Sequence, residues 1–181
     1  MKYVLCFATS ALLLAGCSSV SVTRDYDAAA DFSILKTYAW QHATQPEIGN
    51  PRIDNDLMDE RVRRAVDVQL AEKGFKAVPK EEADFLVAYF VDYKQRIGGS
   101  SVSMSAGRGS YGRYGGVGYS TSVSDYEEGY LTIDIIDPAS DKNVWRGVGR
   151  RTTYEGSSPE KMTKIINTAV SSILTKFPPK K

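Results

Sequence analysis

The sequence Asp-Phe-Leu-Val-Ala-Tyr-Phe-Val-Asp-Tyr-Lys-Gln-Arg-Ile at residues 84–97 decides the fold class. In an extended chain, successive side chains point to opposite sides, so alternate residues share a face. One side carries Phe85, Val87, Tyr89, Val91 and Tyr93, and the other begins with Leu86, Ala88 and Phe90. A strand with two apolar faces belongs inside a sheet, so this stretch predicts a long central strand.

Shorter alternating stretches on both sides of it predict the other strands. Residues 20–26 and 36–41 precede the central strand, and residues 129–137 follow it. The turn residues Asp-Pro-Ala-Ser-Asp at 137–141 then lead into residues 143–154, which we expect to pair with 129–137 as a hairpin. The sequence thus predicts about five strands.

The first helix is predicted over residues 52–73. Met58, Val62, Val66 and Leu70 recur every four residues and form its apolar face, and the charged residues between them predict a solvated face. Gly74 follows, where a left-handed residue commonly ends a helix.

A second helix is expected near the C-terminus. Its apolar stripe has a period of 3.6 residues and comprises Met162, Ile165, Ile166, Ala169, Val170, Ile173, Leu174 and Phe177. Residues 157–160, Ser-Ser-Pro-Glu, predict a capping box at its start, and Pro178-Pro179 ends it. The expected fold is α+β, with two amphipathic helices on an antiparallel or mixed sheet in the order β-β-α-β-β-β-α.

The N-terminus has the pattern of a lipoprotein signal peptide. Lys2 is followed by an almost wholly apolar run that ends at Leu14-Ala15-Gly16-Cys17. A charged start, a short apolar region and small residues before the cleavage point are typical of secretion signals, and the run is shorter than a membrane span. The four residues resemble the bacterial lipobox, in which the cysteine is acylated after cleavage. We therefore expect residues 1–16 to be removed and Cys17 to carry lipid.

The predicted lipoprotein signal implies the domain boundaries and the cellular location of the protein. Residues 17–19 become a short lipidated tether, and residues 20–181 form one domain. Ser18 follows the cysteine, and Asp at that position would retain the protein on the inner membrane, so we expect the outer membrane, facing the periplasm. The inner membrane and the cell surface stay open as alternatives.

Residues 98–120 differ in composition from the rest of the domain. They contain eight of the fifteen glycines and match the dinucleotide pattern Gly-x-Gly-x-x-Gly at 107–112, but the expected strand after them leaves no helix for a phosphate. One interpretation is a hairpin tip too polar to order itself, and another is that the hairpin lengthens the sheet. The functional interpretation is a contact loop for a partner, with candidate residues Arg108, Tyr111, Arg113, Tyr114 and Tyr119.

The sequence offers no recognisable catalytic or metal-binding motif. His42 is the only histidine, and Cys6 is expected to leave with the signal peptide. The pairs 81–82 and 127–128 are adjacent glutamates, which point to opposite faces if they lie on strands. We therefore expect no catalytic residues, no metal and no cofactor.

The arginines of the last strand have two interpretations. Arg146 and Arg150 share one face, and together with Arg108 and Arg113 they could form a basic patch for an anionic surface. Alternatively they pair across the hairpin with Glu128 or with Asp134, which we expect to be a solvated strand residue. The pairing is the preferred interpretation. A chain whose net charge is only +1, exported from the cell, gives no reason to expect nucleic acid as a partner.

An ordered set of short motifs spans nearly the whole mature chain. These motifs are Asp25-Tyr26-Asp27, Asp31-Phe32-Ser33, Lys36-Thr37-Tyr38-Ala39-Trp40, Lys73-Gly74-Phe75, Ala83-Asp84-Phe85-Leu86-Val87-Ala88-Tyr89, and Gly129 to Asp137 with Val144-Trp145-Arg146-Gly147. In this set the chain resembles the bacterial lipoprotein family known as domain of unknown function 4136. The resemblance implies a lipid-anchored α+β domain and supplies no catalytic residues.

These features together predict a membrane-anchored periplasmic lipoprotein that acts as a non-enzymatic binding or accessory module of the cell envelope. Its expected partners are the membrane, through the lipid, and an envelope protein or polymer close to the bilayer. The alternative is a structural lipoprotein that self-associates, for instance through an exposed sheet edge. An enzyme built on scattered residues is the least favoured interpretation.

Overall fold

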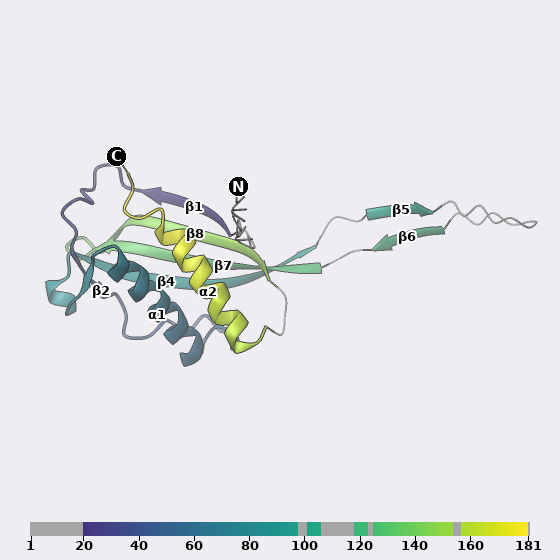
Figure 1. Ribbon diagram of the computed structural model, residues 1–181, viewed down its shortest axis with the longest axis horizontal. Coiled ribbons are helices and arrows are strands. Elements are labelled where there is room, and N and C mark those ends of the chain that lie inside the picture. Colours follow the sequence, from purple (N-terminus) through teal and green to yellow (C-terminus); the bar gives the residue numbers. More distant parts are fainter. Residues whose placement is uncertain (1–19, 98–100, 106–117, 123–124, 154–156, 181) are drawn as a thin grey trace, which may run out of the picture.

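The structure is a computed structural model that describes residues 20–97, 101–105, 118–122, 125–153 and 157–180. Its main feature is a twisted sheet with two helices on one side (Figure 1). The expected α+β class is confirmed. Within the described residues, no helix is both long enough and apolar enough to cross a membrane.

The main sheet has six strands in the order β1-β8-β7-β4-β2-β3. Their bounds are β1 Ser21–Tyr26, β2 Thr37–Trp40, β3 Lys76–Ala77, β4 Phe85–Ile97, β7 Asp125–Asp137 and β8 Lys142–Thr153. The strand β4 lies inside the sheet, as predicted, antiparallel to β7 and parallel to β2. The predicted hairpin is formed by β7 and β8. The sixth strand, β3, was not predicted because two residues are too few to show an alternating pattern.

A second sheet lies inside the glycine-rich segment. It consists of two antiparallel strands, β5 Ser101–Ser105 and β6 Gly118–Ser122. Serine alternates with valine and methionine in β5 and with tyrosine and threonine in β6, and aromatic and β-branched residues favour extended backbone. The hairpin therefore forms a sheet of its own, drawn apart from the main one in Figure 1, and does not add a strand to it.

Helix α1 spans Asp56–Glu72 and begins later than residue 52, the predicted start. Asn55 caps it, since its side chain accepts a hydrogen bond from the Met58 backbone N–H at 3.0 Å. At the other end Gly74 adopts φ +89°, and the Phe75 N–H donates to the Leu70 carbonyl at 3.0 Å. This is the predicted glycine C-cap, and it brings the Phe75 ring onto Phe85.

Helix α2 spans Pro159–Leu174, and the 3₁₀ helix η1 spans Lys80–Glu82. The cap of α2 is Ser158, whose side chain accepts from the Lys161 N–H. The predicted capping box of residues 157–160 is therefore wrong, because the residue three positions after this cap is a lysine and not a glutamate. Past the helix end, Phe177 enters the core and contacts the rings of Phe85 and Trp145.

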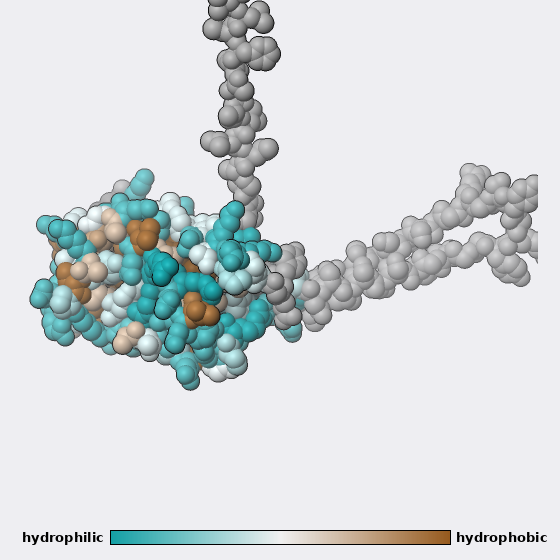
Figure 2. Space-filling view, turned by 60° about the horizontal axis from the view of Figure 1, so that its bottom comes forward, coloured by the Kyte–Doolittle hydropathy of each residue, from teal (hydrophilic) through white to brown (hydrophobic). Residues whose placement is uncertain are grey.

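The core fills the space between the helices and the sheet. Helix α2 approaches β8 at Gly147 and Gly149, where a methyl group would lie within 3 Å of Ile173 in both cases. The missing side chains let the helix lie directly on the strand. On the side of the domain seen in Figure 2, the surface is mainly hydrophilic, with separate hydrophobic spots.

Candidate functional site

The titratable residues singled out in the sequence do not converge on a reaction centre. His42 is exposed, and the described residues hold no group of three histidine, cysteine or acidic side chains placed to bind a metal ion. Glu127 and Glu128 point to opposite faces, as predicted. The first pairs with Arg52 at 2.8 Å and the second with Arg96 at 3.1 Å.

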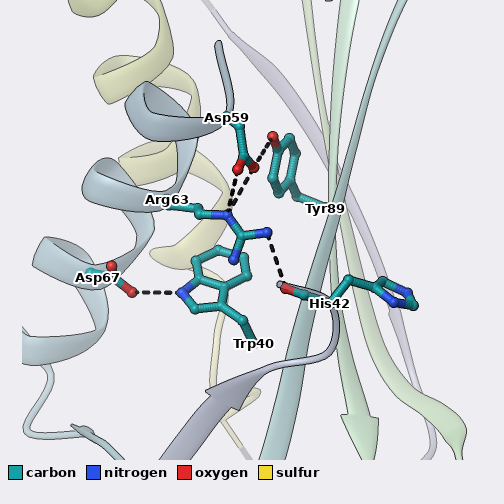
Figure 3. Close-up of polar contacts among 6 residues, drawn as sticks. All are labelled: Trp40, His42, Asp59, Arg63, Asp67 and Tyr89. Carbon is teal, nitrogen blue, oxygen red and sulfur yellow. Dashed lines mark hydrogen bonds and ion pairs between the residues drawn. The ribbon is translucent and has the colours of Figure 1, made fainter. Parts of the chain in front are cut away.

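A polar network joins α1 to the sheet (Figure 3). The carboxylate of Asp59 accepts hydrogen bonds from Tyr89 Oη at 2.7 Å and from Arg63 Nε at 2.8 Å. Arg63 also lies 4.5 Å from the centre of the Trp40 ring and donates to the His42 carbonyl at 3.1 Å. One turn further along α1, Asp67 accepts from Trp40 Nε1 at 3.1 Å.

This network corrects the expectation that the charged residues of α1 form a solvated face. The side chains of Asp59 and Arg63 are only 18% and 17% exposed, because α1 turns them toward β2 and β4. Burial, and the hydrogen bond to Asp59, raise the pKa of Tyr89 above its ordinary value. A phenol held in its neutral form near neutral pH suits a structural role, so the network fastens α1 to the sheet.

We expect Asp59→Ala to destabilise the protein by roughly 2–3 kcal/mol, because it leaves the buried Tyr89 hydroxyl without a partner and frees Arg63. Tyr89→Phe should cost less, about 1 kcal/mol, since Asp59 then keeps Arg63. Glu60→Ala, at an exposed position of the same helix, is the control and should have little effect. Urea unfolding measures all three. Equal losses for Asp59→Ala and Glu60→Ala would show that the network contributes nothing.

Among the described residues, the opposite side of the main sheet carries no α-helix, and we call it the helix-free face. Here the residues of four strands lie side by side, with Phe90 opposite Thr132, Thr132 opposite Val148, and Val148 opposite Thr23. Phe90 is 38% exposed in the middle of this sheet. A small cluster covers one end of the face, and its members are Ala39, Ala83, Leu86, Ala88 and Ile136.

Ion pairs border the Phe90 row on both sides. On one side Arg146 binds Asp134 through two hydrogen bonds of 2.6 and 2.7 Å. On the other, Arg150 lies 3.8 Å from Glu128, whose carboxylate also accepts from Tyr130 Oη. The hydrogen bond from Tyr130 is the largest of the effects that lower the pKa of Glu128.

The preferred interpretation of the two arginines is therefore confirmed, since both face carboxylates across the hairpin. One detail was wrong. Asp134 is not solvated but 2% exposed, because the half-exposed side chain of Arg146 lies across it and Asn143 donates to it as well.

Most candidate residues of the proposed contact loop lie outside the described residues. These are Arg108, Tyr111, Arg113 and Tyr114, and Cys17 also lies outside them. Tyr119 lies on β6, opposite Met104 of β5. Sequence reasoning did not single out Phe90. Its signal was present in the pattern, because the second face of the central strand changes at Phe90 from apolar to charged residues.

The comparison with family models gives a clear match. The model of the domain of unknown function 4136 matches residues 22–179. The chain belongs to this family. Several motif residues have structural roles here. Asp84, for example, accepts backbone hydrogen bonds from Lys36 and Thr37, which lower its pKa and hold the start of β2 against β4.

The solved structures that match this chain have low sequence identity to it. A PDZ domain protein from Parabacteroides distasonis is 12% identical with a TM-score of 0.54, and the match covers 88% of this chain but only 36% of that protein. A PelC dodecamer from Paraburkholderia phytofirmans is also 12% identical, with a TM-score of 0.46, coverage of 90% of this chain and all of that one. A neuraminyllactose-binding hemagglutinin homolog from Helicobacter pylori is 14% identical, with a TM-score of 0.42 and coverage of 86% and 93%. Among curated proteins, none matches the sequence.

Proposed function

We propose that this protein is a lipoprotein of the bacterial envelope, anchored through Cys17 in the outer membrane and facing the periplasm. Its domain acts as a non-enzymatic module that docks another envelope protein through the helix-free face. The support for the anchor is the Leu14-Ala15-Gly16-Cys17 sequence, which ends only three residues before the first described residue, Val20.

The observation that carries the docking role is the exposed Phe90 row between two borders of ion pairs. Aromatic side chains at the centre of an interface supply most of its binding energy, and a polar rim around them excludes water. Here Phe90 provides the centre, and the pairs Arg146–Asp134 and Arg150–Glu128 provide rim charges already fixed in position. A face of this composition fits a folded protein better than a polymer, because fixed charges of both signs need a complementary fixed pattern.

In-cell photo-crosslinking tests this role. A photoreactive amino acid in place of Phe90 should capture one discrete protein, whereas the same amino acid in place of Leu57, which is 63% exposed on α1, should capture none. Adding Val148→Arg, which lies two strands from Phe90 in the same row, should abolish the capture. Adding Glu60→Arg on α1 should not.

Each alternative gives a distinct result. A product that contains two copies of this chain would favour the self-associating structural lipoprotein. Capture from Tyr114 that persists when Val148→Arg is present would move the docking site to the glycine-rich loop. A Phe90 product that is unaffected by Val148→Arg would contradict docking through the helix-free face.

A further inference from the structure

Five basic residues lie on or beside α2: two in the helix, one just past its end, one on β1 and one, half-buried, on β8. We call them the basic flank, and they are Arg24, Arg151, Lys161, Lys164 and Lys176. Helix α2 packs on β1 and β8, and Arg24 of β1 donates a hydrogen bond to the Lys176 carbonyl at 3.2 Å just past the end of α2. These contacts make the helix and the strand one continuous surface.

The basic flank is not neutralised from within the described part of the chain. None of its five side chains forms an ion pair with a described carboxylate. The only acidic residue of α2 is Glu160, and Asp25 of β1 points to the helix-free face because it alternates with Arg24. Helix α1 differs, because acids and bases alternate along it.

The chain enters the domain at this surface. Val20 lines a small apolar pocket together with Met162 and Ile165 of α2 and Arg151 of β8. Three residues, 17–19, connect Cys17 to Val20 and can span at most about 10 Å. A lipid on Cys17 would therefore bring the headgroups to within about one Debye length of the nearest basic residues at 0.1 M salt.

We infer that the basic flank is the membrane-facing surface of the domain, and that it lies on the anionic phospholipid headgroups of the membrane that holds the anchor. This inference rests on the proposed lipidation of Cys17. Lysine and arginine side chains near an anionic bilayer are each attracted to it, and their contributions add along a polybasic segment. With the flank on the membrane, β1 and α2 lie along the bilayer, and α1, which packs against α2 and β3, lies further from it.

Spin labels on the lipidated protein test the orientation. The sequence contains only Cys6 and Cys17, so after processing an introduced cysteine would be the single reactive thiol. One spin label is attached to the cysteine of Thr175→Cys, beside the basic flank, and another, in a separate variant, to the cysteine of Leu57→Cys on α1. In vesicles of phosphatidylethanolamine and phosphatidylglycerol, the Thr175 label should be shielded from a water-soluble nickel reagent, and the Leu57 label should be accessible to it.

A matched pair of variants isolates the charge. Lys161→Gln/Lys164→Gln should lower the ratio of membrane-docked to undocked domain roughly 30-fold. This is the effect expected for the loss of two basic residues near an anionic surface. Lys73→Gln/Lys76→Gln removes the same charge beside β3, at the opposite edge of the sheet from β1, and should change nothing. Replacing phosphatidylglycerol by phosphatidylcholine should also release the Thr175 label from shielding.

The outcomes separate this inference from the anchor. Equal accessibility of the two labels on vesicle-bound protein overturns the orientation and leaves the anchor intact. The same holds if the two charge variants behave alike, or if shielding persists without phosphatidylglycerol. Protein that washes off the vesicles and carries no lipid by mass spectrometry overturns both the anchor and the orientation.

Discussion

Gly147→Ala should destabilise the protein by about 3 kcal/mol, the upper part of the range for overpacking a core. The added methyl group would lie 2.6 Å from Cγ2 of Ile173 and against the indole ring of Trp145. Trp145 and Ile173 are 1% and 0% exposed, so neither can move into solvent. Helix α2 would have to shift away from β8, which weakens the packing between α2 and the sheet. The midpoint of urea unfolding measures the loss.

Two further variants check this explanation. Gly149→Ala is the matched control, because its methyl group meets the end of the flexible Ile173 side chain, Cδ1, at 2.9 Å and should cost less. Ile173→Ala creates a cavity and destabilises by itself. Combined with Gly147→Ala, it should cost less than the sum of the two single changes, because one of the two clashes of the added methyl group, the one with Ile173, is then removed. Strict additivity would mean that the two residues do not collide.

Much of the fold follows from local patterns in the sequence. The stretch at residues 84–97 predicted a central strand because both of its faces begin apolar, and β4 does lie between β7 and β2. The β7–β8 hairpin and α2 were also predicted, since each buries a regular apolar stripe. Such patterns arise because the residues on the side of a strand or helix that faces the core are mainly apolar.

Other features depend on contacts between distant segments, which a periodic pattern does not contain. Asp59, Arg63 and Asp67 have the spacing of a solvated helix stripe, yet α1 turns them toward Tyr89 and Trp40. Asp134 alternates with core residues, but its burial depends on Arg146 of the next strand. Asp59 and Arg63 pair within α1, but in both cases the burial of the charge depends on partners that only the tertiary fold supplies.

The candidate docking surface illustrates the same limit. Phe90 is exposed because both helices lie on the other side of the sheet. The alternating pattern of β4 alone does not show which side the helices cover. The row that joins Phe90 to Thr132 and Val148 further requires the strand register, because a shift of one residue would exchange the two faces.

Cys17→Ser should move the protein completely from the membrane fraction to the soluble fraction. Without the thiol there is no site for the lipid, and the described residues contain no helix that could span a bilayer. The five basic residues of the basic flank contribute only salt-sensitive attraction, which a high-salt wash removes. Fractionation of cells, followed by that wash, measures the change.

Cys6→Ser is the matched control for this prediction. It removes a cysteine from the same apolar segment but leaves the Leu14-Ala15-Gly16-Cys17 sequence intact, so the protein should stay in the membrane fraction. The released Cys17→Ser protein should unfold in urea at the same midpoint as the anchored one, because the core between α1, α2 and the sheet keeps all of its residues. Retention of Cys17→Ser in the membrane after the high-salt wash would falsify the anchor, and with it the limit of about 10 Å that the tether sets between the domain and the bilayer.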